Sequence, residues 1–260
     1  MDEWRSIINK IGIAVIRTGV FISNKASENY RKIDPDVIRH LVQVPLLGYS
    51  FLVSRHEKIN PGKPDGYPPL IFVHGLAGNR GQFLLMAGYL WLLGRKRSYK
   101  INFDSGQSVE DMAAALAHFI RGVRRATGEK QVEIIAHSLG GIVARLAISK
   151  YRLSSGVRTL ITLGTPHHGT YHARYANTTI IRELRPDSKI IKFLDKQRWP
   201  KGVRGVTFWS RNDLFVLPAE SAALNGTEKI DATPFTHYSY LIDPKSWAAV
   251  GRALDSRQRH

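Results

Sequence analysis

A serine between an expected strand and an expected helix has the surroundings that point most directly to chemistry. Ser138 follows a strand expected at 131–135 and precedes a helix expected at 140–151. The small residues Ala136 and Gly140 flank it at minus two and plus two, and they let the strand and the helix approach closely. Such a turn holds an exposed hydroxyl on a rigid support, as attack on an acyl carbon requires. The alternative is an ordinary glycine-rich turn, but this placement favours a nucleophile.

A second motif, Val73-His-Gly-Leu-Ala-Gly78, follows an earlier apolar run. The tetrahedral intermediate of acyl transfer carries an oxyanion that needs two positioned N–H donors. One donor is expected from Leu139, the residue after the nucleophile, and the other from Leu76 in this loop. Gly75 and Gly78 allow close approach of the backbone. His74 is interpreted as a structural histidine that ties the loop in place.

The acid is expected to follow the serine in the chain, because the triad of a strand-turn-helix serine runs in the order Ser, acid, His. Asp213 lies just past an apolar run at 205–210, and is the leading candidate. An acid at the end of a strand is well placed to hold an imidazole. Asp231 and Glu220 are the lesser candidates.

The base is then His237. Beyond Asp213 only His237 and His260 remain, and His260 is the last residue of the sequence. In the expected mechanism His237 takes the proton of Ser138 and returns it to the leaving alcohol, while Asp213 fixes the tautomer and stabilises the imidazolium. Water activated by the same imidazole then releases the acid product.

The elements that must position these residues alternate along the chain. The expected strands are 69–73, 99–103, 131–135, 157–163 and 205–210, and the expected helices are 82–93, 109–126, 140–151 and 246–254. Strands separated by helix-length segments predict an α/β fold with a mostly parallel central sheet and helices on both faces. Ligands of such sheets bind at the carboxyl ends of the strands.

The expected organisation is an N-terminal helical extension and linker at 1–66 and a catalytic domain at 67–260. The boundary is a run rich in Pro and Gly at 60–69, which continues neither a helix nor a strand. Apolar residues before it fall on two faces of a helix, so the extension either packs on the enzyme or lies on a membrane. A basic, mostly helical insertion at 168–203 interrupts the catalytic domain.

The composition limits the classes of protein. The chain has 260 residues, 43% of them hydrophobic, which suits one large domain. The absence of cysteine excludes disulfides and a thiolate nucleophile. We expect no transmembrane helix and no signal peptide, hence a cytoplasmic or peripherally membrane-associated protein. The net charge is +17, and residues 145–204 hold 13 Lys and Arg against 3 Asp and Glu. That surface either aids solubility or attracts an anionic partner such as a membrane.

From about residue 69 to 253 the chain resembles the bacterial lipase branch of the α/β-hydrolase superfamily. The matching segments are Phe72-Val-His-Gly-Leu76, Ile135-Ala-His-Ser-Leu-Gly-Gly141, Leu160-Ile-Thr-Leu-Gly-Thr-Pro-His-His-Gly169, Ser210-Arg-Asn-Asp213 and Thr236-His237. The resemblance implies an α/β-hydrolase fold and ester hydrolysis without a metal or organic cofactor. The insertion after Gly169 is longer than in small lidless members, so a helical lid is implied over 168–203. The resemblance does not reach residues 1–60.

The function predicted is a serine carboxylester hydrolase that acts on lipid-like or acyl esters through an acyl-enzyme. An acyltransferase or thioesterase would use the same triad. A non-catalytic module that binds a membrane or polyanion is a third hypothesis, against which the intact Ser, His and acid set argues. His167 and His168 have no third metal ligand at a recognisable spacing, so a structural loop is the preferred interpretation. Nucleic acid is not an expected partner, because no known binding motif is visible.

Overall fold

The computed structural model describes residues 59–103, 106–175 and 178–255. The expected N-terminal helical extension lies almost wholly outside these residues, so its place in the domain organisation stays a prediction. Among the described residues, no helix is both long enough and apolar enough to span a bilayer.

A six-stranded sheet forms the centre of the described chain, with strand order β2-β1-β3-β4-β5-β6 and every neighbouring pair parallel. The strands are β1 (Leu70–Val73), β2 (Ser98–Lys100), β3 (Val132–His137), β4 (Val157–Leu163), β5 (Arg204–Trp209) and β6 (Glu228–Asp231). The α-helices are α3 (Leu84–Leu92), α4 (Val109–Thr127), α5 (Leu139–Lys150), α6 (Thr179–Glu183), α7 (Lys189–Asp195), α8 (Ser239–Ile242) and α9 (Pro244–Asp255). Short 3-10 turns lie at Arg80–Phe83, Ser154–Gly156, Tyr171–Arg174 and Ala219–Ala222.

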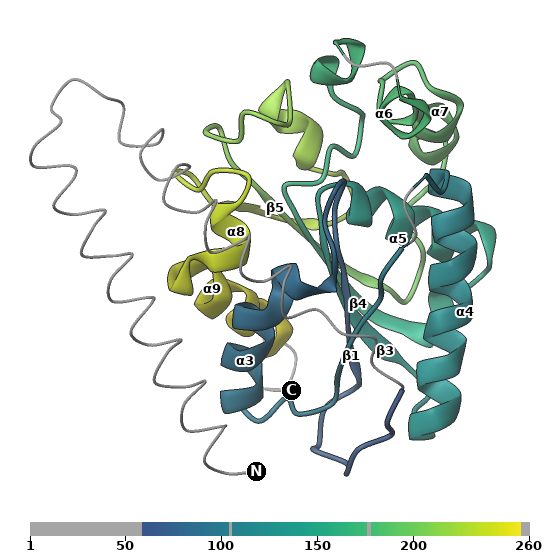
Figure 1. The fold of residues 1–260 in the computed structure, drawn as a ribbon, viewed down its shortest axis with the longest axis vertical. Coiled ribbons are helices and arrows are strands. Elements are labelled where there is room, and N and C mark those ends of the chain that lie inside the picture. The colour runs from purple at the N-terminus through teal and green to yellow at the C-terminus, as the bar shows by residue number, and fades with distance from the viewer. Residues whose placement is uncertain (1–58, 104–105, 176–177, 256–260) are drawn as a thin grey trace, which may run out of the picture.

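Helices cover both faces of the sheet, as predicted (Figure 1). Alternate residues of a strand point to opposite faces, so each central strand feeds two separate cores. Ile71 and Ile134 pack with α4 and α5, whereas Phe72 and Ile135 pack with α3, α8 and α9. A sheet buried on both sides explains why these strands read as continuous apolar runs.

The longest helix, α4, shows how local sequence sets the limits of an element. The Ser108 hydroxyl accepts the backbone N–H of Asp111, and the Asp111 carboxylate reaches back to Ser108, which forms a capping box. Gly128 ends the helix in the left-handed conformation at φ +73°. Between them, buried apolar residues recur at helical spacing and face the sheet. The predicted helix at 109–126 is thus confirmed.

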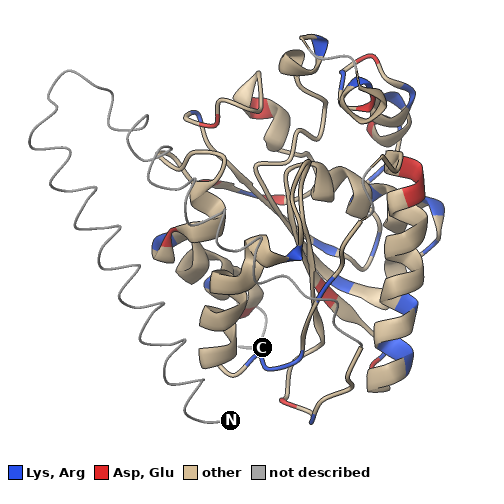
Figure 2. Cartoon of the chain, viewed as in Figure 1, with Lys and Arg blue, Asp and Glu red and all other residues tan. Residues whose placement is uncertain are grey.

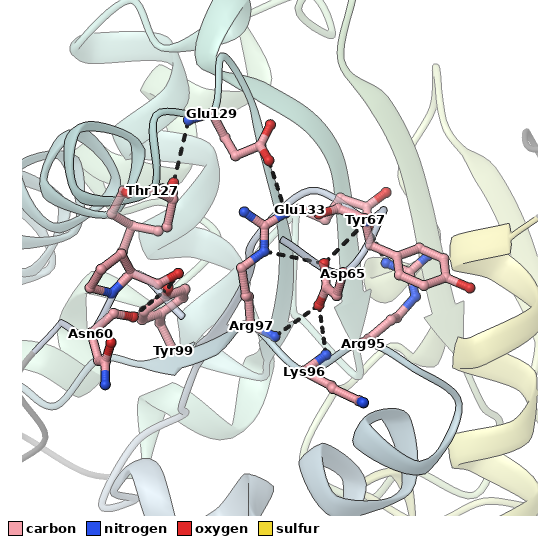
Figure 3. A network of polar contacts seen from close by, with 12 residues as sticks. Asn60, Asp65, Tyr67, Arg95, Lys96, Arg97, Tyr99, Thr127, Glu129 and Glu133 are labelled. Atoms are coloured by element: carbon pink, nitrogen blue, oxygen red, sulfur yellow. Dashed lines mark hydrogen bonds and ion pairs between the residues drawn. The ribbon is translucent and has the colours of Figure 1, made fainter. Parts of the chain in front are cut away.

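The amino ends of the strands are tied to the preceding linker by charged side chains (Figure 3). The Arg97 guanidinium donates to Asp65, to Glu129 and to the carbonyl of Tyr67. The Arg95 guanidinium donates to Glu133 of β3, and both side chains are almost completely buried. The bonds of Arg97 to Asp65 and Tyr67 fasten the described part of the Pro- and Gly-rich run, and the Arg95 pair holds the segment before β2 against β3.

The insertion at 168–203 carries α6 and α7, which lie above the carboxyl ends of the strands (Figure 1). It is fastened below by the buried Arg145 of α5. The Arg145 guanidinium donates to the carbonyls of His167 and Leu194, at 2.9 and 3.1 Å. Burial lowers the pKa of Arg145 to about 10. Whether the insertion works as a lid remains a prediction.

Candidate active site

Ser138 lies at the sharp turn where β3 ends and α5 begins. It has φ +53° and ψ −125°, a left-handed conformation that is costly for a residue with a Cβ and that persists only when the surroundings enforce it. Its N–H donates to the carbonyl of Leu163 at the end of β4, at 2.9 Å. A Cβ added at Gly140 would lie 2.5 Å from the carbonyl oxygen of Val73, so only glycine lets α5 approach β1 this closely.

The loop after β1 lies directly against the serine. A Cβ added at Gly75 would come within 2.9 Å of the Cβ of Ser138. The loop turns at once, with a bond from the N–H of Gly78 to the carbonyl of Gly75, so the turn bond does not use the N–H of Leu76. Leu139 is the first residue of α5, where helix N–H groups have no partner within the helix. Leu139 directly follows the serine in the chain, and Leu76 directly follows Gly75, which lies against the serine.

His74 holds this loop. Its Nδ1 lies 3.0 Å from the carbonyl oxygen of Gly75, and its Nε2 lies 3.2 Å from the backbone nitrogen of Phe103. An imidazole with its proton on Nδ1 satisfies both bonds. Burial lowers the pKa of His74, which favours this neutral form. The geometry suits the structural role that the sequence suggested.

Asp213 and His237 lie together after β5 and before α8. The Nδ1 of His237 lies 2.9 Å from each carboxylate oxygen of Asp213, and both side chains are buried. Asp213 also accepts the backbone N–H of Phe215. The Phe215 ring covers the imidazole, with 4.8 Å between the ring centroids. A carboxylate placed in this way selects the tautomer of His237 whose Nε2 is free to accept a proton.

Three contacts bring this pair to the serine. The ring of His137, next to Ser138 in the chain, lies 4.6 Å from the ring of His237. A Cβ added at Gly164 would lie 2.6 Å from the Asp213 carboxylate and 3.3 Å from Nδ1 of His237. Gly164 directly follows Leu163, which accepts the N–H of Ser138. The residues predicted as nucleophile, base and acid therefore gather at one edge of the sheet.

The other candidates lie elsewhere or are otherwise engaged. Asp231 and Glu220 are exposed, and the carboxylate of Asp231 accepts the N–H of Thr233. His260 lies outside the described residues. His167 is buried against Thr162 and Arg145, and His168 contacts Asp195. No group of three potential metal ligands occurs within the described ranges.

Exposed apolar side chains occur on the segments that follow β1, β4 and β5, which the sequence analysis did not anticipate. They are Leu76, Tyr171, Tyr175, Leu214, Phe215 and Leu217, here called the apolar rim. Two hydrogen bonds join parts of it: the N–H of Tyr171 donates to the carbonyl of Leu217, and the hydroxyl of Thr170 donates to the carbonyl of Phe215. A general signal was present in the sequence, since Leu214-Phe-Val-Leu217 is an apolar run outside any expected strand.

Comparison with known sequences gives matches to part of the chain. Residues 63–181 match the model of a family described as the PGAP1-like alpha/beta domain. A GPI inositol-deacylase B of Yarrowia lipolytica is 33% identical over 144 residues, which are 44% of this chain and 15% of that protein. A triacylglycerol lipase of Pseudarthrobacter phenanthrenivorans is 28% identical over 121 residues, 43% of this chain and 37% of that one. The chain thus spans well under half the length of these relatives.

Solved structures share the fold at low sequence identity. The mature form of a Bacillus licheniformis lipase superposes with a TM-score of 0.64 at 21% identity, over 76% of this chain and 95% of that one. Aspergillus fumigatus lipase B gives 0.64 at 22% identity, over 79% and 58% of the two chains. Sheet order, turn geometry and these similarities together show that the chain belongs to the α/β-hydrolase superfamily, with lipases and esterases among its relatives.

Proposed function

We propose that the protein is a serine carboxylester hydrolase in which Ser138 is the nucleophile, His237 the general base and Asp213 the acid that orients it. One observation carries the proposal. A serine held at φ +53° between a strand and a helix lies at the same edge of the sheet as a buried histidine bonded to a buried carboxylate. Backbone strain at a serine near such a histidine and carboxylate is typical of a catalytic nucleophile.

The chemistry follows from the positions of the groups. His237 accepts the proton of Ser138 as the hydroxyl attacks the acyl carbon, and the resulting imidazolium is stabilised by Asp213 at 2.9 Å. The N–H groups of Leu76 and Leu139 stabilise the oxyanion. The imidazolium then protonates the leaving alcohol, and an acyl-enzyme remains on Ser138. Water, deprotonated by His237, attacks this ester and releases the carboxylic acid.

A series of p-nitrophenyl esters from short to long acyl chains tests the proposal. We expect the wild-type protein to hydrolyse them and Ser138→Ala to lose at least about a thousandfold in kcat. Thr165→Ala is a matched control, because this buried hydroxyl lies near the first turn of α5 but has no role in the mechanism. Hydrolysis that survives Ser138→Ala would refute the assignment of the nucleophile.

The surroundings of the site favour lipid-like esters. The apolar rim exposes large side chains on the segments that follow β1, β4 and β5, and its Phe215 packs on the ring of His237, so an acyl chain could bury this surface. The adjoining insertion at 168–203 has 8 Lys and Arg against 3 Asp and Glu. Seven of the eight cations are exposed, and several follow α6 and α7 in Figure 2. We propose that this basic surface orients the enzyme on anionic lipid surfaces.

Reversal of charge tests the orientation on lipid. Lys189→Glu/Lys192→Glu changes two exposed positions of α7, while Lys63→Glu/Lys130→Glu makes the same change at exposed positions near the amino ends of the strands. Only the first variant is expected to lose activity on anionic vesicles, with turnover of a short soluble ester unchanged. Added salt is expected to act on the vesicle assay alone. Equal salt sensitivity in the two assays would contradict this part of the proposal.

The relatives suggest which alcohols to compare. Their names, GPI inositol-deacylase and triacylglycerol lipase, make an acylated inositol and a triacylglycerol the first natural esters to test. An acyltransferase or thioesterase would form the same acyl-enzyme. Product analysis with added alcohol separates the first from a hydrolase, because an acyltransferase yields a new ester in place of the free acid. A matched thioester assay separates the second.

A further inference from the structure

A second histidine, at the end of a central strand, contacts the proposed general base. His137 is the last residue of β3 and its ring is buried. Its Nε2 lies 2.9 Å from the backbone carbonyl oxygen of His237, which is 100 residues further along the chain. A carbonyl oxygen only accepts, so Nε2 of His137 carries the proton and donates it. The mechanism proposed above does not use this bond.

The bond adds a second anchor for His237. Asp213 holds the imidazole through Nδ1 and comes from the end of β5. His137 holds the main chain of the same residue and comes from the end of β3, one residue before the serine. The first contact sets the orientation of the ring, and the second fixes the main chain of the base relative to the strand that carries the nucleophile.

The other nitrogen of His137 shows that this ring is not simply a satisfied core residue. Its Nδ1 is buried without a hydrogen-bond partner, at a site where a Cβ added to Gly75 would lie 3.2 Å away. An apolar side chain would avoid the cost of burying that lone pair. A histidine here therefore costs stability on one side of the ring and gains only the bond to His237 on the other.

The surroundings also keep His137 uncharged. Burial lowers its pKa well below the ordinary value. The neighbouring rings of His237 and His74 act in the same direction, and the bond to the His237 carbonyl opposes them without outweighing them. The ring of Tyr238 also lies near that of His137, with centroids 6.2 Å apart. A neutral His137 does not repel the imidazolium that forms on His237 during turnover.

We propose that His137 is a positioning residue, which sets the distance between the base His237 and the nucleophile Ser138 through its bond to the carbonyl of His237. The proposal rests on the proposed hydrolase function and deepens it. A small displacement of a catalytic group lowers the rate of the chemical step far more than it lowers substrate affinity. Loss of this bond should therefore appear in kcat.

Two variants separate positioning from packing. His137→Phe keeps a ring and removes the donor, whereas His137→Gln keeps an N–H at a similar reach. We expect His137→Phe to lower kcat roughly 10- to 100-fold with KM within about twofold, while its melting temperature stays near that of the wild type. His137→Gln should recover most of the loss. Equal kcat values for His137→Phe and the wild type, or equal losses in both variants, would overturn the proposal.

A measurement on the unaltered protein covers the case in which His137→Phe does not fold. Nitrogen NMR of the histidine side chains, with the resonances of His137 assigned, should show its imidazole with the proton on Nε2, slow to exchange and unchanged between pH 5 and 9. A His137 ring that titrates in that range, or that carries its proton on Nδ1, would exclude the bond. Ser138→Ala separates a failure of the hydrolase proposal from a failure of the positioning proposal. If Ser138→Ala stays active, the hydrolase proposal fails. If Ser138→Ala is inactive and His137→Phe has the kcat of the wild type, only the positioning role of His137 is excluded.

Discussion

The two ends of the parallel sheet use their polar residues in opposite ways. At the amino ends, buried cations face buried carboxylates, as Arg95 faces Glu133 and Arg97 faces Asp65 (Figure 3). At the carboxyl ends, Ser138 has a strained backbone and His137 keeps an unpartnered nitrogen. The Tyr240 hydroxyl is also buried there without a partner, and apolar side chains face solvent.

This difference separates stability from function within one domain. Ion pairs at the amino ends hold the linker, through Arg97 and Asp65, and the segment before β2, through Arg95 and Glu133, to the sheet. Strain and unsatisfied polar atoms occur near both ends, since Arg152 has φ +53° and Nε of Arg124 is buried without a partner before β4. At the carboxyl ends, however, they occur beside the buried pair of Asp213 and His237, where they can serve binding or catalysis. Mutations at the carboxyl ends should therefore mainly lower activity, whereas mutations at the amino ends should mainly lower the stability of the fold.

The largest expected effect is on activity, at Asp213. In Asp213→Asn an amide faces Nδ1 of His237 and selects the wrong tautomer, so kcat should fall by roughly a thousandfold or more. Asp231→Asn is the matched control, because this acid is exposed and its carboxylate accepts the N–H of the nearby Thr233. The control should retain kcat within about a factor of two. Comparable losses in both variants would remove Asp213 from the site.

Acid should destabilise the carboxyl ends first. Burial lowers the pKa of His74, His137 and His167 below 6.5, so the unfolded chain binds more protons below that pH and stability falls as the pH drops. Each histidine contributes up to about 1.4 kcal/mol per pH unit. Urea unfolding at pH 7, 6 and 5 measures the slope. His167→Gln should reduce the slope by roughly one proton, whereas a change at the exposed His118 should not alter it.

The amino ends respond to acid in a lower range. Burial raises the pKa of Asp65, but hydrogen bonds from Arg97, Tyr67 and Lys96 outweigh it and the net pKa lies below 3.8. Stability from this lowered pKa is present above 3.8 and is lost as the pH falls through the folded value. An unfolding free energy that stays constant from pH 7 to 5 and falls only below pH 3.8 would mean that the two ends do not differ as described.

A smaller effect, on folding alone, is expected at Glu133. Glu133→Leu leaves the buried guanidinium of Arg95 with the half-exposed Asp255 and the face of the Tyr67 ring, and should cost about 3 kcal/mol of unfolding free energy. Arg95→Met/Glu133→Leu removes both charges and should restore much of it. Turnover per folded molecule should be unchanged in both variants. Denaturant titrations beside an ester assay check this, and a change in kcat would couple the two ends.

The sequence predicts the fold well where apolar runs are continuous. The strand expected at 157–163 and the helix at 109–126 agree with β4 and α4 nearly to the residue. The strand β6 escapes prediction because Glu228-Lys-Ile-Asp231 is polar and mostly exposed at the edge of the sheet. The expected helix at 82–93 begins as a 3-10 turn, since the side chain of Asn79 caps the N–H of Gly81.

The site is less evenly predictable. The strand-turn-helix context marks Ser138, and chain order then narrows the acid and the base to Asp213 and His237. The remaining features depend on contacts between distant segments. The bond from His137 to a main-chain carbonyl 100 residues away has no local signature, and neither has the grip of Arg145 on the carbonyls of His167 and Leu194. Main-chain acceptors carry no residue identity, so sequence patterns cannot reveal them.

Labelling with a fluorophosphonate, followed by mass spectrometry of the peptides, tests the central claim most directly. The reagent reacts with a serine whose hydroxyl is activated by a base. We predict one modification, on the peptide that carries Ser138, which is absent in Ser138→Ala and strongly slowed in His237→Gln. A label on another residue, or equal labelling in His237→Gln, would contradict the account.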